Sequence, residues 1–337
     1  MLAEKGRIGK WGAEFPGPGQ DLLPRRAASI LDGMITPVIS SRFIRTIHEV
    51  FGPEGDDWLV QLPALLAECA ARWALQVQPP FDLSYNYVAP ARRSDGAAVV
   101  LKLGVPNPEL TTEIAAMRLY DGRGAARLLD ADAERGCLLL ERLKPGTPLV
   151  AVADDAAATA IAAEVMRQLW RPVPAAHPFP DVRRWARALY TLRDQYGGTT
   201  GPLPAYLVDQ ALRLHDELIA SSAAPVVLHA DLHHWNILAA ERAPWLALDP
   251  KGVIGEPAYE VGALLRNPIH EIATWPNARQ VLARRIDQLA ETLGFDRQRL
   301  VGWGIAQVVL SACWDLEDST FGGWQAWIGV ADILAAL

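Results

Sequence analysis

The stretch VVLHADLHHWNILAAERAPWLALDPKG, from Val226 to Gly252, places a dense group of polar side chains between apolar segments. An apolar strand is expected to end before His229, and two short strands, Ile237–Ala239 and Trp245–Leu248, are expected to flank a turn. The stretch contains the pattern His-x-Asp-x-x-x-x-Asn, and a further Asp follows the second short strand. Such groups are costly to bury without partners, so the stretch predicts either a chemical site or a polar loop.

Three interpretations of this stretch differ in how many of its residues they use. Zinc could bind His229, Asp231, His233 and His234, but the spacing matches neither HExxH nor a zinc finger. A structural loop would use the histidines to satisfy backbone groups. A phosphoryl-transfer site uses more of the pattern, because kinase-type sites need an Asp for the substrate hydroxyl and an Asn and a second Asp for Mg²⁺.

A kinase-type site also needs a lysine on a strand and a glutamate on a helix that holds it. The segment AAVVLKLG places Lys102 after four apolar residues, and Glu113 lies in the next predicted helix. A lysine inside an apolar strand is costly to bury without a partner, and Glu113 can supply one. The alternative is a lysine on an edge strand that points to water.

The residues before about 143 predict a small antiparallel sheet with one inserted helix. A helix is expected over 63–75 with Pro63 in its first turn. A hairpin is expected around Asp95-Gly96, a helix from about Pro108 to Gly122, and two strands around the turn at 134–136.

Beyond the segment KPGTPL helical periodicity dominates. Helices are expected over 153–170, 181–196, 204–222, 276–294 and 296–317. The chain is therefore predicted to be an α+β protein with two lobes. Residues 1–33 are expected to be a disordered extension because they are rich in Gly and Pro, 34–143 to form the N-terminal lobe, and 144–337 to form the helical lobe.

The overall composition narrows the class of partner. The net charge of −7 argues against nucleic acid and favours a cationic small molecule. The three cysteines form no CxxC pair, and the sequence shows neither a bilayer-length apolar run nor a signal peptide. We therefore expect a cytoplasmic protein that does not bind a membrane.

These motifs resemble the aminoglycoside phosphotransferases, which have a bilobal protein-kinase-like fold. LHADLHHWNIL, WLALDPKGVIGEPAYEVGALLRNP, LLLERLKPG and LSACWDLED are most similar to the branch of streptomycin 6-kinases and hydroxyurea kinases, and the similarity spans roughly 58–335. The resemblance implies ATP and Mg²⁺ as cofactors. It implies the following roles: catalytic base, Asp231; magnesium ligands, Asn236 and Asp249; phosphate-binding lysine and its partner, Lys102 and Glu113.

The same resemblance gives expectations for the surrounding residues. His229 should be structural, and Glu260 and Arg266 should be a buried pair or helix caps outside the catalytic machinery. Many relatives have His-Gly-Asp where this chain has Ala230, so ordinary backbone angles are expected there, since alanine has less backbone freedom than glycine.

The nucleotide-binding parts leave weaker signals in the sequence. No GxGxxG or GxxxxGK[ST] motif is present, so SYNYVAP is expected to cover the phosphates through Ser84 or backbone amides. An extended linker could present the backbone of Glu141 and Leu143 to an adenine edge. A plain crossover strand is the alternative.

The expected reaction is transfer of phosphate from ATP to a hydroxyl of a streptomycin-like aminoglycoside, which confers resistance. A metabolic kinase acting on a sugar, an amino sugar or a hydroxyurea-like compound is the alternative, and a non-catalytic nucleotide-binding protein is a third class. A cationic acceptor needs carboxylates and flat apolar faces. Trp314, Glu317 and Asp318 share one face of a predicted helix, although an ordinary acidic helix end would look alike. Glu271, next to His270, is a lesser candidate.

Overall fold

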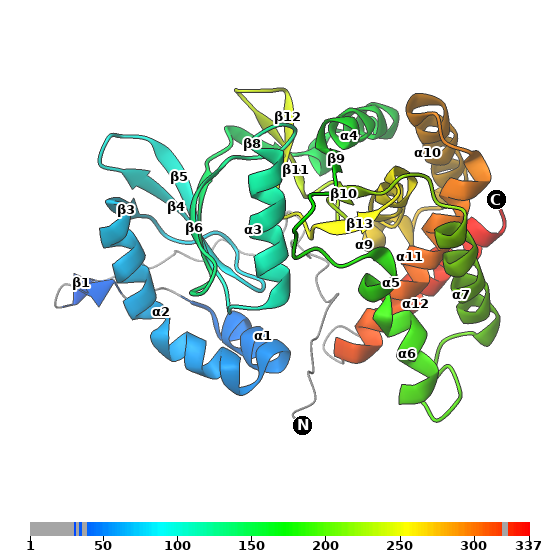
Figure 1. The fold of residues 1–337 in the computed structure, drawn as a ribbon, viewed down its shortest axis with the longest axis horizontal. Coiled ribbons are helices and arrows are strands. Elements are labelled where there is room, and N and C mark those ends of the chain that lie inside the picture. The colour runs from blue at the N-terminus through cyan, green and yellow to red at the C-terminus, as the bar shows by residue number, and fades with distance from the viewer. Residues whose placement is uncertain (1–29, 32–33, 36–38, 319–322) are drawn as a thin grey trace. The chain divides into compact units, whose positions relative to one another are not determined.

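The computed structural model describes residues 30–31, 34–35, 39–318 and 323–337 (Figure 1). The predicted extension 1–33 therefore lies outside the described residues, apart from strand β1 (Ile30–Leu31), which pairs with β2 (Met34–Ile35). The chain forms two compact units. Of the described residues, the sheet unit comprises those up to Ile114 and Ala126–Arg142, and the helical unit comprises Ala115–Ala125 and those from Leu143 onward.

The sheet unit contains the predicted antiparallel sheet, which has five strands in the order β3-β4-β5-β7-β6. The hairpin at Asp95-Gly96 is confirmed, with Gly96 at φ 86°. β5 is the central strand, so its residue Lys102 lies between Val88 and Leu138 of its two neighbours. The strands are β3 Leu75–Val77, β4 Tyr87–Arg93, β5 Ala98–Leu103, β6 Leu128–Asp132 and β7 Cys137–Glu141, and the inserted helix is α3 Pro108–Tyr120.

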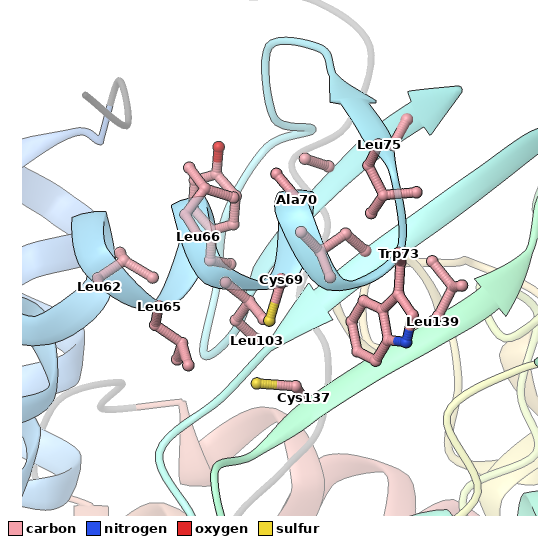
Figure 2. Close-up of a cluster of buried hydrophobic side chains, with 14 of the residues drawn as sticks. Leu62, Leu65, Leu66, Cys69, Ala70, Trp73, Leu75, Leu103, Cys137 and Leu139 are labelled. Atoms are coloured by element: carbon pink, nitrogen blue, oxygen red, sulfur yellow. The ribbon is translucent and has the colours of Figure 1, made fainter. Parts of the chain in front are cut away.

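Helices α1 (Ser41–Phe51) and α2 (Pro53–Arg72) cover one face of this sheet. Figure 2 shows Leu62, Leu66 and Cys69 of α2 in the same cluster as Leu103 and Leu139 of the sheet. The helix predicted to begin at Pro63 is longer than expected. Pro53 occupies its first turn, where a missing N–H costs nothing, and Pro63 is tolerated in its interior.

Two glycines bring the ends of β5 and β7 into contact. Gly136 has φ 70°, and its carbonyl accepts a hydrogen bond from Gly104 N–H at 2.9 Å. A Cβ atom on Gly136 would lie 2.1 Å from the carbonyl oxygen of Gly104, which is part of the backbone and cannot rotate away. The turn between β6 and β7 therefore requires glycine for two separate reasons.

The helical unit is organised around α11 (Arg297–Asp318), which contacts α7 (Ala205–Ala220), α10 (Ala278–Leu293) and α12 (Trp324–Ala335) (Figure 1). The helix predicted over 181–196 is interrupted at Ala186, which separates α5 (Val182–Trp185) from α6 (Arg187–Gln195). Helix α12 was not predicted. The remaining helices are α4 Asp155–Leu169, α8 Val261–Leu265 and α9 Ile269–Ile272, with 3-10 turns η1 Leu149–Ala151 and η2 Pro257–Glu260.

Two small sheets carry the stretch that opened the sequence analysis. One has the order β13-β10-β9 and the other β12-β11-β8. The strands are β8 Pro145–Pro148, β9 Arg171–Pro172, β10 Val226–Leu228, β11 Ile237–Ala240, β12 Trp245–Ala247 and β13 Val253–Gly255. Within the described part of the chain, no helix has both the length and the apolar character needed to span a membrane.

Replacement of Gly136 by alanine should lower the free energy of unfolding by more than about 2 kcal/mol. The left-handed conformation alone costs an alanine about 1–2 kcal/mol, and the contact with the Gly104 carbonyl adds to it. Urea unfolding of Gly136→Ala and Gly96→Ala would test this. A Cβ on Gly96 meets nothing within 4 Å among the described residues, so this control carries the conformational cost alone. Equal losses in the two variants would contradict the role of the backbone contact.

Candidate active site

Backbone pairing brings the polar residues of the predicted motif to one end of the β11–β12 hairpin. Asn236 directly precedes β11, and its carbonyl accepts from Leu248 N–H at 3.0 Å. Asp249 follows Leu248, and Lys251 N–H donates to His229 O at 2.8 Å. The segment after the hairpin is therefore tied to the loop that follows β10, which we call the polar loop (residues 229–236).

The carboxylate of Glu260 holds the start of the polar loop. Its Oε2 accepts from the N–H of His229 at 2.8 Å, and its Oε1 accepts from the N–H of Ala230 at 2.7 Å. Ala230 has φ 65°, so the expectation of ordinary backbone angles there was wrong. The two hydrogen bonds to a buried carboxylate offset the cost of this left-handed alanine.

Glu260 occupies the N-cap position of α8, as one of its expected roles had it, but its side chain makes no capping hydrogen bond and binds the polar loop instead. Burial raises its pKa to about 7, the two backbone N–H groups oppose that rise, and the nearby Asp231 carboxylate adds to it. Only 1% of the residue is exposed to solvent.

Asp231 is buried in the polar loop, with 2% of the residue exposed. Its Oδ1 accepts from Arg266 Nη2 at 2.8 Å, and its Oδ2 lies 3.5 Å from Asn236 Nδ2 and 3.7 Å from His233 Nε2. Burial would raise the pKa of Asp231, but His233, Arg266 and Lys251 outweigh it and lower the pKa to about 2. The carboxylate is thus ionised at neutral pH.

The expected roles of Glu260 and Arg266 missed these contacts with the polar loop. Arg266 is the C-cap residue of α8, the helix that it is expected to steady, and its guanidinium in addition donates to Asp231. In the sequence, Arg266 stands out as a charged residue between the apolar run before it and the Asn-Pro pair after it. Its target lies 35 residues earlier in the chain, so local spacing could not identify it.

The histidines of the polar loop satisfy local groups and do not gather around a metal. His229 Nε2 donates to Leu248 O at 2.8 Å, while its Nδ1 accepts from Asp231 N–H at 3.3 Å. Burial lowers the pKa of His229 to about 4, so the ring is neutral. His234 Nε2 lies 3.4 Å from Arg285 Nη2. Among the described residues no three His, Cys, Asp or Glu side chains could hold a metal ion together, which disfavours the zinc interpretation.

Asn236 and Asp249 offer oxygens of the kind that Mg²⁺ prefers. The amide of Asn236 is oriented by a hydrogen bond from Nδ2 to Asp231 O at 2.9 Å. Its Oδ1 is buried and accepts no hydrogen bond from the described residues. Asp249 is half-buried at φ 59° beyond the facing strand. An amide oxygen without a partner and a carboxylate fit a hard cation that completes its shell with water and phosphate.

In the sheet unit, Lys102 and Glu113 form the predicted ion pair. Lys102 Nζ lies 2.7 Å from Glu113 Oε1 and 2.9 Å from Oε2, and both residues are buried. Lys102 is 3% exposed on the central strand, so it is not an edge-strand lysine that points to water. The carboxylate of Glu113 offsets part of the cost of burying the Lys102 side chain on the central strand.

The other residues expected to bind the nucleotide differ in burial and in whether their backbone groups already have hydrogen-bond partners. Ser84 is half-buried in the segment that joins β3 to β4. The N–H of Glu141 donates to Arg127 O at 2.9 Å, and its Oε2 accepts from Arg127 N–H at 3.0 Å. The Glu141 N–H is therefore unavailable to a ligand, which corrects half of the expectation for this residue. Leu143 is half-buried at the start of the helical unit.

The expected acceptor residues lie on two different elements. Trp314 of α11 packs edge-on against Trp185 at 5.8 Å between ring centroids, and its buried Nε1 has no partner among the described residues. Glu317 Oε1 accepts from Gln195 Nε2 at 3.0 Å. Glu271 is exposed on α9. The side chains of Asp318 and His270 lie outside the described residues.

Helix α11 also carries a carboxylate that the sequence analysis did not select. Asp315 Oδ2 accepts from Trp327 Nε1 of α12 at 2.8 Å. The acidic character of the segment was visible in the sequence. The contact with α12 was not, because that helix was not predicted.

The order of the strands in the sheet unit and the arrangement of the polar loop define a protein-kinase-like phosphotransferase. A comparison with solved structures supports this fold: choline kinase LicA from Streptococcus pneumoniae matches 82% of this chain and 100% of its own at a TM-score of 0.58. The sequence identity is 13%, so this likeness concerns the fold.

Sequence comparison then identifies the family. The family model for aminoglycoside/hydroxyurea antibiotic resistance kinases matches residues 72–319, and the chain belongs to this family. It is 37% identical to streptomycin 6-kinase of Streptomyces glaucescens over 80% of this chain and 88% of that protein. It is 34% identical to hydroxyurea phosphotransferase of Kitasatospora aureofaciens over 84% and 82%, respectively.

Replacement of Ala230 by glycine should preserve activity and raise the free energy of unfolding by up to about 1 kcal/mol, because glycine adopts positive φ without the clash of a Cβ. Ala230→Val should lower stability and activity, since a β-branched residue does not tolerate this conformation. Thermal unfolding and turnover of both variants would test the assignment.

A matched control for this experiment is Ala162→Gly in the middle of α4, where the alanine is buried in ordinary helix. That variant should lose about 1 kcal/mol. A loss of the same size in Ala230→Gly would show that the left-handed conformation is not strained.

Proposed function

We propose that this protein transfers a phosphoryl group from ATP to a hydroxyl of a streptomycin-like aminoglycoside and so confers resistance to it. The observation that carries the proposal is the buried carboxylate of Asp231, held next to Asn236, whose amide oxygen has no hydrogen-bond partner among the described residues. Membership of the kinase family and the similarity to a streptomycin 6-kinase support the acceptor class.

Asp231 acts in this proposal on the acceptor hydroxyl. Its low pKa makes it a weak base, which suits a loose transition state in which the hydroxyl loses its proton late. Its contribution is therefore to orient the nucleophile and to receive the proton as the new bond forms. Most of the acceleration comes from positioning and from fixed charges.

Lys102 binds the phosphates of the nucleotide in this proposal, and Glu113 keeps its ammonium in place. Asn236 and Asp249 would hold Mg²⁺ through the Asn236 Oδ1 and the Asp249 carboxylate. When bound, the metal neutralises charge on the triphosphate. Ser84 and the backbones of Leu143 and Glu141 remain candidates for phosphate and adenine contacts, with Glu141 restricted to groups other than its N–H.

The acceptor site is proposed on α11. Trp314 offers an indole with a spare donor, and Glu317 offers a half-buried carboxylate on the same helix. Asp318 is placed next to Glu317 by sequence, and Glu271 on α9 is a weaker candidate. A guanidinium or ammonium group on the acceptor would make charge-assisted hydrogen bonds with such carboxylates.

A second candidate function is phosphorylation of a small hydroxyl compound such as hydroxyurea. The similarity to a hydroxyurea phosphotransferase supports it. A neutral acceptor of this size would not require the carboxylate of Glu317. The two candidates therefore differ in their response to the same substitution.

The purified protein should release ADP in the presence of streptomycin and Mg²⁺, and the product should carry a phosphate ester. A panel of streptomycin, other aminoglycosides, sugars and hydroxyurea would identify the acceptor by coupled ADP detection and mass spectrometry. Activity should be lost when EDTA removes the metal. Transfer to a sugar or to hydroxyurea, but to no aminoglycoside, would reject the preferred acceptor class.

Asp231→Asn is the matched control for this assay. It keeps the size of the side chain and should reduce turnover about 100-fold or more while ATP binding changes only a few-fold. Near-normal turnover in the folded variant would show that Asp231 is not the catalytic base.

Glu317→Gln should raise the KM for a cationic acceptor about tenfold and leave the KM for ATP unchanged, because one charge-assisted contact is lost. Initial rates with each substrate varied in turn would measure both constants. Glu291→Gln on the exposed side of α10 is a matched control that should change neither. If the acceptor KM stays constant in Glu317→Gln, the carboxylate belongs to an ordinary helix end.

A further inference from the structure

Arg266 is a buried arginine that joins the polar loop to the longest helix of the helical unit. The residue is 4% exposed and forms the C-terminal cap of α8. Its Nη2 donates to Asp231 Oδ1 at 2.8 Å, and its Nη1 donates to Ser311 Oγ at 3.2 Å. Ser311 is in turn held in α11 by donation to Gln307 O at 3.0 Å. The guanidinium is therefore fixed at two points, of which one is the proposed catalytic base.

This contact makes the two oxygens of the Asp231 carboxylate unequal. Oδ1 receives a short, charge-assisted hydrogen bond from Arg266. Oδ2 has two longer contacts, at 3.5 Å to Asn236 Nδ2 and 3.7 Å to His233 Nε2, which are weak by the usual geometric criteria. Oδ1 thus already accepts the strongest of these contacts, and Oδ2 keeps the greater capacity to accept a hydrogen bond from a hydroxyl.

We propose that Arg266 is a positioning residue that turns the Asp231 carboxylate so that Oδ2 meets the acceptor hydroxyl. The inference rests on the proposed function and adds to it a residue that acts through Asp231. A guanidinium suits this role because its planar fork reaches Asp231 and Ser311 at once, whereas a lysine ammonium is a single point charge on a flexible stem.

A purely structural role for Arg266 is the competing explanation. A buried carboxylate needs a counter-charge, and removal of one partner from a buried pair destabilises a protein whatever the function of the pair. The two roles differ in how they depend on Asp231. A positioning residue affects turnover only while the Asp231 carboxylate is present, and a structural residue affects stability whether or not Asp231 takes part in chemistry.

The test is a double-mutant cycle with Arg266→Lys and Asp231→Asn. Arg266→Lys alone should lower kcat about 10-fold to 100-fold with both KM values within about threefold, because the base is present but misdirected. In the Asp231→Asn background the same replacement should change turnover by less than about twofold. Single-turnover measurements with radiolabelled ATP would reach the slow rates of that background.

Two further variants keep the test decisive. Ser311→Ala removes the anchor of the guanidinium but leaves the charge pair, and it should lower kcat about threefold to tenfold in the Asp231 background only. If Arg266→Lys does not fold, Ser311→Ala takes its place in the double-mutant cycle. Arg299→Lys is the control. Arg299 Nε donates to Oε1 of the buried Glu256 at 2.6 Å, and neither residue belongs to the polar loop. It should lower the Tm and leave kcat unchanged.

The outcomes distinguish a failure of the role proposed for Arg266 from a failure of the proposed function. Equal losses of turnover in both backgrounds, or a loss confined to KM, would overturn the positioning role of Arg266 and leave the proposed function intact. Turnover that is insensitive to Asp231→Asn would overturn the proposed function and this inference together.

Discussion

The polar loop depends on the short helix α8 and the turn before it. Glu260, at the end of η2, holds the backbone of the loop through two consecutive N–H groups, and Arg266, at the other end of α8, holds the side chain of Asp231. One rigid element of a single helical turn and its caps therefore fixes both the path of the loop and the direction of its carboxylate. The left-handed Ala230 is a consequence of this constraint.

Two neighbouring buried carboxylates differ in charge state because different groups surround them. Asp231 faces a guanidinium, an imidazole and an ammonium, which lower its pKa to about 2 in spite of burial. Glu260 faces backbone N–H groups and the charge of Asp231, and its pKa rises to about 7. The group with the lower pKa is thus the one proposed to act on the acceptor hydroxyl, while the carboxylate with the raised pKa holds the backbone of the polar loop.

The sequence predicted the parts of the fold and site that depend on local spacing. The hairpin at Asp95-Gly96, the pairing of Lys102 with Glu113, and the placement of Asn236 across a hairpin from Asp249 follow from short-range patterns. The conformation of Ala230 did not follow, because the carboxylate that enforces it lies 30 residues later. The start of α2 and the break at Ala186 were also missed, since packing overrides local propensity there.

The proposed chemical groups of the helical unit occupy one continuous segment, whereas the proposed acceptor residues lie on separate helices near the end of the chain. Asp231, Asn236 and Asp249 are held in one arrangement by the pairing of the β11–β12 hairpin and by the hydrogen bonds of Glu260 to the polar loop. Substitutions at Glu271 of α9 or at the C-terminal end of α11, beyond Ser311, would alter the proposed acceptor residues and leave the contacts of that segment in place. A chain built in this way could acquire new acceptors through stepwise substitutions while the groups proposed for phosphoryl transfer keep their relative positions.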